Sequence, residues 1–395
     1  MTIKCNVCGF EGHYLAPHLL EAHGLTEADY DGEVTSPALD AAFEANVKGR
    51  RRAAFDPSKG VTARFAGIPM PVALDVPESA CLPLPAAYSV PAHGKLADAV
   101  RRVAARVAAG GSKPLWLWGP PGTGKDAVFA AISARTRRPA MVFNITPDSD
   151  ISGWLATRAL GKDGTYWEEG PLLRALRDGF KTADGRTVPY LIVLSDIDRA
   201  TRAQQEPLRA ILDSLGGRVP AANGMHKVLP GTLVVATANT SGGGDTSGRY
   251  TATPTDTSVL DRFTFKVTFS NMDIRDEEPI LRAKYPQIAA RFPDLIPTVM
   301  RATTAIRDAV EKDEVFMDFG HRTVGNWMDA ISVESTFYAG KDAAKVIRAG
   351  LQDVLAGCPN EDTREAVKRL VDPHLKGGAV EEGDTSHISR DPLAP

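Results

Sequence analysis

Residues Gly119 to Asp126 read Gly-Pro-Pro-Gly-Thr-Gly-Lys-Asp, a glycine-rich turn that ends in a lysine and a carboxylate. The apolar run 115–118 precedes this turn, and the helix-like run 127–132 follows it. In this context backbone N–H groups can face phosphate oxygens, the helix N-terminus adds a positive dipole end, and Lys125 supplies a charge for the β and γ phosphates. The pattern predicts an ATP-binding loop formed by Gly119, Pro120, Pro121, Gly122, Thr123, Gly124, Lys125, Asp126 and Ala127.

Asp126 stands where such a loop normally carries a Ser or Thr hydroxyl that contacts Mg²⁺. A carboxylate there repels the phosphates unless a metal ion lies between them, so a compensating change is expected elsewhere. The apolar run 191–194 predicts a buried strand, and Ser195 and Asp196 follow it. Nucleotide hydrolases usually place a metal-holding Asp and then a water-activating Glu at these two positions.

The two unusual residues can compensate for each other. If Asp126 and Ser195 face the same Mg²⁺, the hydroxyl and the carboxylate have exchanged places, and the oxygen types and charge around the ion are unchanged. Asp196 would then be the general base or would position the attacking water. The competing hypothesis is a degenerate site that binds nucleotide and hydrolyses it slowly or not at all. We favour the exchange, because random loss would rarely restore the missing group at the partner position.

The elements that must position these residues alternate along the chain. Apolar residues at helical spacing predict a helix over Gly94–Ala109, and strands are expected over 140–144, 191–194 and 232–237 with helices between them. This order predicts an α/β fold with a parallel sheet between helices. From residue 273 onward, helical spacing without strand signals predicts a lid that hinges with nucleotide state.

Composition bounds the remaining possibilities. The chain has 395 residues, 43% of them hydrophobic, which is enough for at least one large core. A net charge of −3 gives no overall attraction to nucleic acid. Four cysteines do not make a disulfide framework, and we find neither a signal peptide nor an apolar stretch near the ~18 residues of a membrane span. We therefore expect a soluble cytoplasmic protein with no membrane partner.

The first thirty residues predict a small zinc finger. Cys5, Cys8, His18 and His23 have the spacing of tetrahedral Zn²⁺ ligands, with His13 as an alternative ligand. So short a segment cannot build a core alone, so folding and metal binding would be one event. The competing interpretation is a tail with incidental Cys and His.

The segment up to Tyr30 resembles the Ros/MucR type of short bacterial zinc finger, a family in which the finger binds DNA. The helix expected around its histidines is not basic, and Glu21 lies between them. The finger can therefore equally bind protein, and DNA remains a possible partner.

Further motifs occur in a specific order after the phosphate-binding loop. The strand 232–237 ends in Ala-Asn-Thr, followed by Gly-Asp-Thr-Ser-Gly-Arg-Tyr at 244–250 and Leu-Asp-Arg-Phe at 260–263. With their spacing from Lys125, these motifs resemble the AAA+ family and, within it, the MoxR branch, closest to the CobS group of aerobic cobaltochelatase ATPase subunits. The resemblance covers roughly residues 75 to 335 and includes His-Arg-Thr-Val at 321–324.

The resemblance implies roles for individual residues. Asn239 matches the sensor-1 position, whose amide orients the attacking water. Arg262 matches the arginine that the family presents to the γ-phosphate of a neighbouring subunit, and Arg322 matches the sensor-2 arginine of the lid. An arginine acting on the next subunit requires a closed ring, which is usually a hexamer in this family. Nothing in the sequence identifies a corrin or cobalt site.

The predicted organisation is a zinc finger over 1–30, a linker over 31–75, an AAA+ α/β core over 76–272, a helical lid over 273–375 and a disordered tail over 376–395. Within the core, 153–171 matches the MoxR insertion, where Tyr166 and Trp167 could grip a partner at the ring axis or pack within a loop. Asn-Gly at 223–224 predicts a hairpin within 216–230.

Two functions are compatible with the sequence. The favoured one is a ring ATPase that uses ATP and Mg²⁺ to remodel or activate a client or adaptor protein. The resemblance implies a partner with a metal-adhesion domain, because MoxR-type ATPases commonly work with such proteins. The alternative is a nucleotide-gated assembly or DNA-binding module that is recruited through the finger and hydrolyses ATP weakly or not at all.

Overall fold

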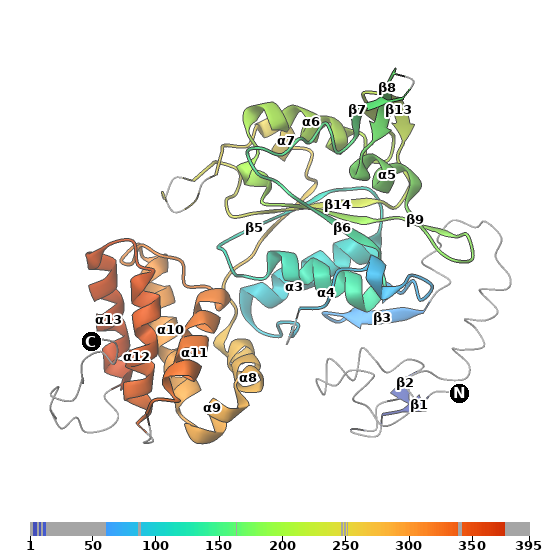
Figure 1. Cartoon of the computed structure of the whole chain (residues 1–395). Helices are drawn as coiled ribbons and strands as arrows, with labels where there is room; N and C mark the ends of the chain where they lie inside the picture. The colour runs from blue at the N-terminus through green and yellow to red at the C-terminus, as the bar shows by residue number, and fades with distance from the viewer. Residues whose placement is uncertain are drawn as a thin grey trace. The chain divides into compact units, whose positions relative to one another are not determined.

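The computed structural model describes residues 3–5, 8, 11–12, 61–85, 88–162, 164–245, 248, 250, 252–338 and 342–375. The chain divides into two compact units, shown in Figure 1. The first runs to Ile280 and also includes Gly320–Arg322, and the second comprises Leu281–Phe319 and the chain from Thr323 onward. His18, His23, most of the predicted linker and the predicted tail lie outside the described residues.

A five-stranded parallel sheet forms the centre of the first unit. Its order is β15 (Phe265–Thr268), β5 (Leu115–Trp118), β14 (Leu233–Ala238), β11 (Leu191–Ser195) and β6 (Ala140–Asn144). Every neighbouring pair in the sheet is parallel. All residues of β11 and β14 are buried, as expected of strands covered on both faces. This confirms the predicted α/β fold with a parallel sheet between helices.

Side chains alternate between the two faces of this sheet. Leu115 and Leu117 pack in the same core as α3 (Gly94–Ala109) and α4 (Lys125–Thr136), whereas Trp116 packs in the core of the opposite face. That opposite face is covered by α5 (Pro171–Asp178), α6 (Arg202–Asp213) and α7 (Thr257–Leu260) (Figure 1). The carboxyl ends of the strands therefore open at one edge between two helical layers.

Residues 62–71 differ from the predicted linker. Here β3 (Thr62–Phe65) and β4 (Ile68–Pro71) form an antiparallel hairpin. Phe65 and Met70 are buried in the same core as α3 and α4. This hairpin could not be predicted from the sequence, because its strands are short and its turn, Ala66-Gly67, lacks the usual Asn-Gly signal, although both residues adopt positive φ.

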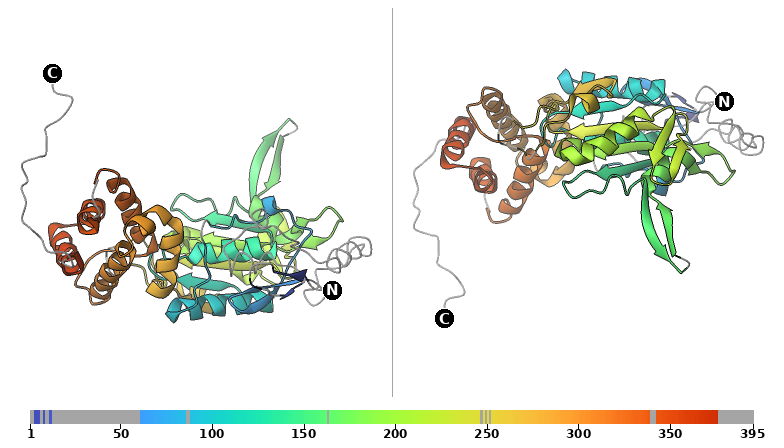
Figure 2. Two further views of the ribbon diagram at one scale, coloured as in Figure 1. Left: turned by 90° about the horizontal axis from the view of Figure 1, so that it is seen from below. Right: turned by 90° about the horizontal axis from the view of Figure 1, so that it is seen from above.

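Smaller hairpins extend from the α/β core. The predicted hairpin around 223–224 is confirmed as β12 (Arg218–Ala221) paired with β13 (Gly224–Lys227). The predicted insertion contains β7 (Ala156–Gly161) paired with β8 (Gly164–Glu169), which projects from the layers of the core (Figure 2). The other short pairs are β9 (Phe180–Lys181) with β10 (Thr187–Val188), and β1 (Ile3–Lys4) with β2 (Glu11–Gly12).

The second unit is helical, as the apolar spacing after residue 273 predicts. Its core surrounds Trp327, whose ring meets that of Phe319 edge-on with 6.2 Å between centroids. None of the helices in the described ranges is both long and apolar enough to span a membrane. The helices of this part of the chain are α8 (Ile274–Lys284), which crosses the boundary between the units, α9 (Pro286–Arg291), α10 (Leu295–Glu311), α11 (His321–Glu334), α12 (Ala343–Ala356) and α13 (Glu361–Leu375).

Candidate nucleotide site

The loop between β5 and α4 has a backbone that only glycine can supply at key positions. Gly119 has φ +152°, and a Cβ on it would lie 2.0 Å from the carbonyl oxygen of Phe269. Gly122, with φ +75°, lies directly against Arg322, since an added Cβ would be 3.1 Å from the Cβ of that residue. The loop therefore turns tightly, with its glycines pressed against neighbouring backbone, before α4 begins at Lys125.

The ammonium group of Lys125 is held inside this turn. Its Nζ donates to the carbonyl oxygens of Gly119 at 2.8 Å and Pro120 at 2.9 Å, and to Oδ1 of Asn239 at 3.2 Å. The residue is buried, and burial lowers the pKa of the ammonium group, with a smaller effect in the same direction from Arg322. The structure thus brings Lys125 together with Asn239, the predicted sensor-1 residue.

Asp126, Ser195 and Thr237 form a compact oxygen cluster beside the loop. Ser195 Oγ donates to Asp126 Oδ1 at 3.3 Å, and Thr237 Oγ1 donates to the same oxygen at 2.8 Å. The two hydroxyl oxygens are 3.4 Å apart. The structure brings the two predicted partners into contact and adds Thr237, which sequence analysis missed. Its signal was its place at the end of β14, the strand paired with β11.

The chemistry of this cluster fits Mg²⁺. One carboxylate and two hydroxyls offer the hard oxygen ligands that Mg²⁺ prefers, and Mg²⁺ usually keeps several waters and takes phosphate oxygens as well. The three side chains come from the first turn of α4 and from the ends of β11 and β14. Asp126, Ser195 and Thr237 are therefore the residues that would hold the ion.

Asp196 follows β11 directly and adopts a left-handed backbone with φ 55°. Non-glycine residues in this conformation are strained and occur preferentially at functional sites. Burial raises the pKa of its carboxyl group, and the nearby carboxylates of Asp126 and Asp198 raise it further. A carboxylate with increased proton affinity is a better proton acceptor at neutral pH.

Asp198 braces the end of β14 from inside the core. Its Oδ2 accepts from the backbone N–H groups of Asn239 and Thr240, both at 2.9 Å, and from the Thr240 hydroxyl at 3.1 Å. Because it fixes the backbone of Asn239, it also places the amide that meets Lys125. The role of Asp198 could not be predicted from the sequence, since this contact joins residues 41 positions apart.

The two predicted arginines have different surroundings. Arg322 adjoins Gly122, and the neighbouring His321 has its Nδ1 2.8 Å from Oε1 of the buried Glu277. Arg262 forms a bidentate pair with Asp213, with Nε–Oδ1 and Nη2–Oδ2 distances of 2.5 and 2.8 Å. Its side chain is 28% exposed. These contacts do not include the phosphate-binding loop of the same chain.

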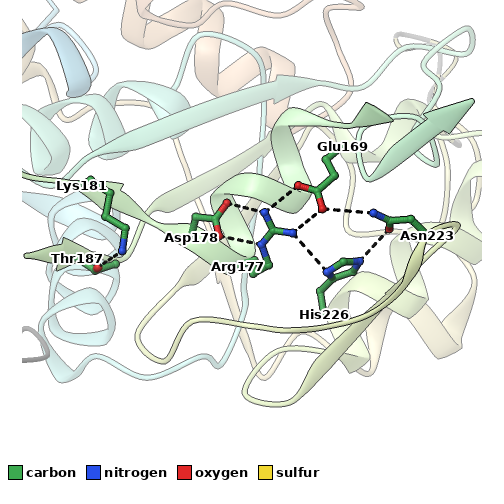
Figure 3. Close-up of polar contacts among 7 residues, drawn as sticks. All are labelled: Glu169, Arg177, Asp178, Lys181, Thr187, Asn223 and His226. Carbon is green, nitrogen blue, oxygen red and sulfur yellow. Dashed lines mark hydrogen bonds and ion pairs between the residues drawn. The ribbon is translucent and has the colours of Figure 1, made fainter. Parts of the chain in front are cut away.

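A ring of polar contacts joins the base of the β7–β8 hairpin to the turn and second strand of the β12–β13 hairpin (Figure 3). Arg177 of α5 donates two hydrogen bonds to Glu169, at 2.6 and 2.8 Å, and two to Asp178, both at 2.8 Å. Its Nη1 also lies 3.5 Å from Nδ1 of His226, whose Nε2 is 2.8 Å from Asn223 Oδ1. Asn223 Nδ2 completes the ring by donating to Glu169 at 3.3 Å. We call these five residues the hairpin clasp.

Exposed apolar side chains lie beyond the clasp. On β7 and β8, Leu160 is 84% exposed, Tyr166 53% and Trp167 42%, while Met225 on β13 is 59% exposed. The guanidinium carbon of Arg158 lies 5.5 Å from the centre of the Trp167 ring. Tyr166 and Trp167 are therefore available to another molecule and are not packed into the core.

A family model described as AAA domain, dynein-related subfamily, matches residues 114–255. This segment is an AAA domain. Its phosphate-binding loop, oxygen cluster, Asp198 and Asn239 all lie within the match. AAA domains generally have ATPase activity, so the match indicates ATPase activity in general terms.

The AAA domain is also similar to parts of curated proteins. The denitrification regulatory protein NirQ of Pseudomonas aeruginosa is 35% identical over 66 residues, which are 17% of this chain and 25% of NirQ. Protein NorQ of Paracoccus denitrificans is 33% identical over 139 residues, or 33% of this chain and 46% of NorQ. The chain thus matches less than half the length of either relative.

Among solved structures, a RuvB K64R mutant from Thermotoga maritima aligns with a TM-score of 0.41 and 12% identity, covering 68% of this chain and 69% of that one. NtrX from Brucella abortus with ADP aligns with a TM-score of 0.43 and 18% identity, covering 72% and 63%. Scores at this level support no inference about function.

The hairpin clasp generates a testable expectation. Arg177→Met keeps the apolar stem of the side chain but removes every hydrogen bond that the guanidinium group makes in the clasp. Amide hydrogen exchange within 156–169 and 218–227 should become about tenfold faster, because charged hydrogen bonds that restrain local opening are lost. Helices α3 and α4 should be unaffected.

The matched control is Arg174→Met, an exposed arginine on the same helix. Equal exchange in the Arg177→Met variant and the native protein would show that the two hairpins are held by other contacts.

Proposed function

We propose that the AAA domain binds ATP with Mg²⁺ and hydrolyses it through a metal site in which the usual carboxylate and hydroxyl have exchanged positions. The observation that carries this proposal is the direct contact of Asp126 with Ser195 and Thr237 beside Lys125. Asp126, Ser195 and Thr237 would hold the Mg²⁺, which when bound would neutralise phosphate charge. A site losing function at random would have no reason to retain a hydroxyl partner on each neighbouring strand.

The protein side chains then divide the work of phosphoryl transfer. Lys125 supplies positive charge to the phosphates, and Asp196 accepts or orients a proton of the attacking water. Asn239, held by Asp198, positions that water, and Arg322 adds positive charge at the loop. The raised pKa of Asp196 supports a role in proton transfer, although its side chain is one methylene shorter than the usual Glu.

We further propose that the chain works as a ring, usually hexameric in AAA+ ATPases of the MoxR branch. Arg262 supports this arrangement, because it is partly exposed, held rigidly by Asp213, and makes none of its described contacts with its own phosphate loop. In a head-to-tail ring it would reach the γ-phosphate bound by the neighbouring subunit.

The client of this ring is proposed to be a protein, engaged through the β7–β8 hairpin. Exposed aromatic residues such as Tyr166 and Trp167 are suited to grip a partner, and the clasp fixes the base of the hairpin to the core. Similarity to NirQ, which is described as a denitrification regulatory protein, supports a regulatory or activating role towards another protein, one with a metal-adhesion domain being a candidate.

A second function is favoured by one observation, the replacement of the usual acidic pair by Ser195 and Asp196. In that case the chain is a nucleotide-gated assembly or DNA-binding module that holds ATP without turning it over.

For the N-terminal segment we propose a Zn²⁺ site formed by Cys5, Cys8, His18 and His23. Both cysteines fall between the paired strands β1 and β2, as expected of a zinc-binding hairpin. No group of three or more His, Cys, Asp or Glu residues suited to a metal occurs in the part of the chain that the structure describes, which excludes both of these histidines.

Measuring phosphate release from ATP in the presence of Mg²⁺ distinguishes the two proposed functions. We expect turnover that disappears in Lys125→Ala and persists in Lys113→Ala, an exposed lysine before β5. Asp126→Ser alone should lose activity, because the proposed Mg²⁺ site then lacks its carboxylate. Asp126→Ser combined with Ser195→Asp should recover activity to within about tenfold of the native chain, since coupled sites are not additive.

Saturable ATP binding without phosphate release in the native chain would favour the module. A double variant no more active than Asp126→Ser alone would instead support a degenerate site.

The ring proposal predicts complementation between subunits. Arg262→Ala should reduce turnover by about 10³-fold and retain ATP binding, because a finger arginine stabilises charge only as the γ-phosphate leaves. Mixing Arg262→Ala with Lys125→Ala should restore part of the activity, since some interfaces then combine an intact loop with an intact arginine. Arg209→Ala, which removes a surface pair with Glu206 and leaves the pair of Arg262 with Asp213 in place, is the control. Absence of recovery on mixing would contradict action across an interface.

The zinc proposal is tested by metal analysis of the full chain. The native protein should carry about one zinc per chain, as a four-ligand structural site requires. Cys5→Ala should lose this metal, whereas Cys81→Ala, outside the segment, should keep it. A native chain purified without chelators that contains no zinc would contradict the site.

A further inference from the structure

A cavity of about 690 Å³ lies at the edge of the sheet opposite the nucleotide site. Its lining includes Gly111, Arg138, Pro189 and Gly231, which precede β5, β6, β11 and β14 respectively. Because these strands are parallel, the lining gathers at their amino ends, while the phosphate-binding loop follows the carboxyl end of β5. Ligands of open α/β sheets ordinarily bind at the carboxyl edge, so this is a separate cavity and no extension of the ATP site.

Arg138 gives the cavity an uncompensated positive charge. Its Nη2 donates to the carbonyl oxygen of Gly231 at 2.8 Å, and among the described residues no carboxylate lies within ion-pair distance of it. Burial lowers the pKa of this guanidinium to about 10. Arg138 is half-buried, and a guanidinium that is partly shielded from water without a carboxylate partner gains from pairing with an anion.

The other cationic side chains of the lining, Arg186 and Lys181, differ from each other in their partners. Arg186 is already paired with Asp75 and with Asp184 at 3.5 Å. Lys181 donates to the hydroxyl of Thr187, at 2.5 Å, and can contribute a second positive charge (Figure 3). The charge of the lining is therefore positive at Arg138 and Lys181, with no acidic side chain among the lining residues.

The remaining wall is largely apolar. Val107 at the end of α3, Val188 of β10 and Leu229 before β14 contribute hydrocarbon surface, together with Met70 of β4. The volume lies in the range of small-molecule sites, which combine apolar walls with a few polar groups that fix orientation. A ligand that satisfies both features has one anionic group on an apolar body.

We propose that this cavity is a binding site for a small amphipathic organic carboxylate. Its carboxylate pairs with the guanidinium of Arg138, which is suited to bidentate recognition of carboxylates. Its hydrocarbon body lies against Val107, Val188 and Leu229. The site is independent of the proposed ATPase activity, because no residue of its lining belongs to the phosphate loop or the oxygen cluster.

Isothermal titration of the full chain with octanoate tests the site. We expect saturable binding of about one octanoate per chain, and much weaker binding of 1-octanol, which has the same body without the charge. Arg138→Met should weaken octanoate binding at least about tenfold, as loss of a charged hydrogen-bonded pair implies, whereas Arg138→Lys should retain part of it. Leu229→Trp should also weaken binding, because it fills the cavity and leaves Arg138 in place.

Two controls test whether the effect of Arg138→Met is specific to the cavity and whether this variant is folded. Arg101→Met removes an exposed arginine of α3 that pairs with Asp98, and should leave octanoate affinity unchanged. Binding of a fluorescent ATP analogue should be equal in the Arg138→Met variant and the native chain, which shows that the variant is folded. The proposal is overturned if octanoate shows no saturable binding, if 1-octanol binds equally well, or if Arg138→Met binds octanoate like the native chain.

Discussion

A carboxylate placed one residue after the phosphate-binding lysine is the constraint around which the nucleotide site is organised. Asp126 occupies the first turn of α4, where the helix dipole favours negative charge but the phosphates of a nucleotide oppose it. The conflict is resolved locally, since Ser195 and Thr237 both direct hydroxyl groups at this carboxylate. The chain thereby brings together side-chain oxygens from three elements that are distant in sequence.

The parallel sheet makes this convergence possible. The ends of β11 and β14 lie side by side, so residues 195 and 237 meet although more than forty positions separate them. Asp198 also connects the two strand ends. It lies just after β11 and accepts hydrogen bonds from the backbone just after β14. Burial of both strands on two faces leaves the arrangement little freedom to shift.

Elements with strong local signals could be predicted from the sequence. The apolar runs at 140–144 and 191–194 appear as strands at nearly the same residues, and the amphipathic helix Gly94–Ala109 has the predicted bounds. The glycine pattern predicted the loop at 119–126. The proximity of Asp126 and Ser195 could be predicted because each carries the group that is usual at the position of the other. Contacts with a weak local signal or none could not be predicted. Thr237 shares its place near a strand end with several other polar residues, and the hairpin at 62–71 depends on burial of Phe65 against distant helices.

The internal contacts of Lys125 bear on how a nucleotide enters and leaves. Its ammonium group already has two carbonyl acceptors and an amide oxygen in the same chain. An incoming phosphate thus exchanges one set of acceptors for another, so the gain on association is smaller than that of a lysine recruited from water. In the proposed ATPase cycle the same acceptors would receive the lysine again when product departs, which would favour repeated cycles over permanent occupancy.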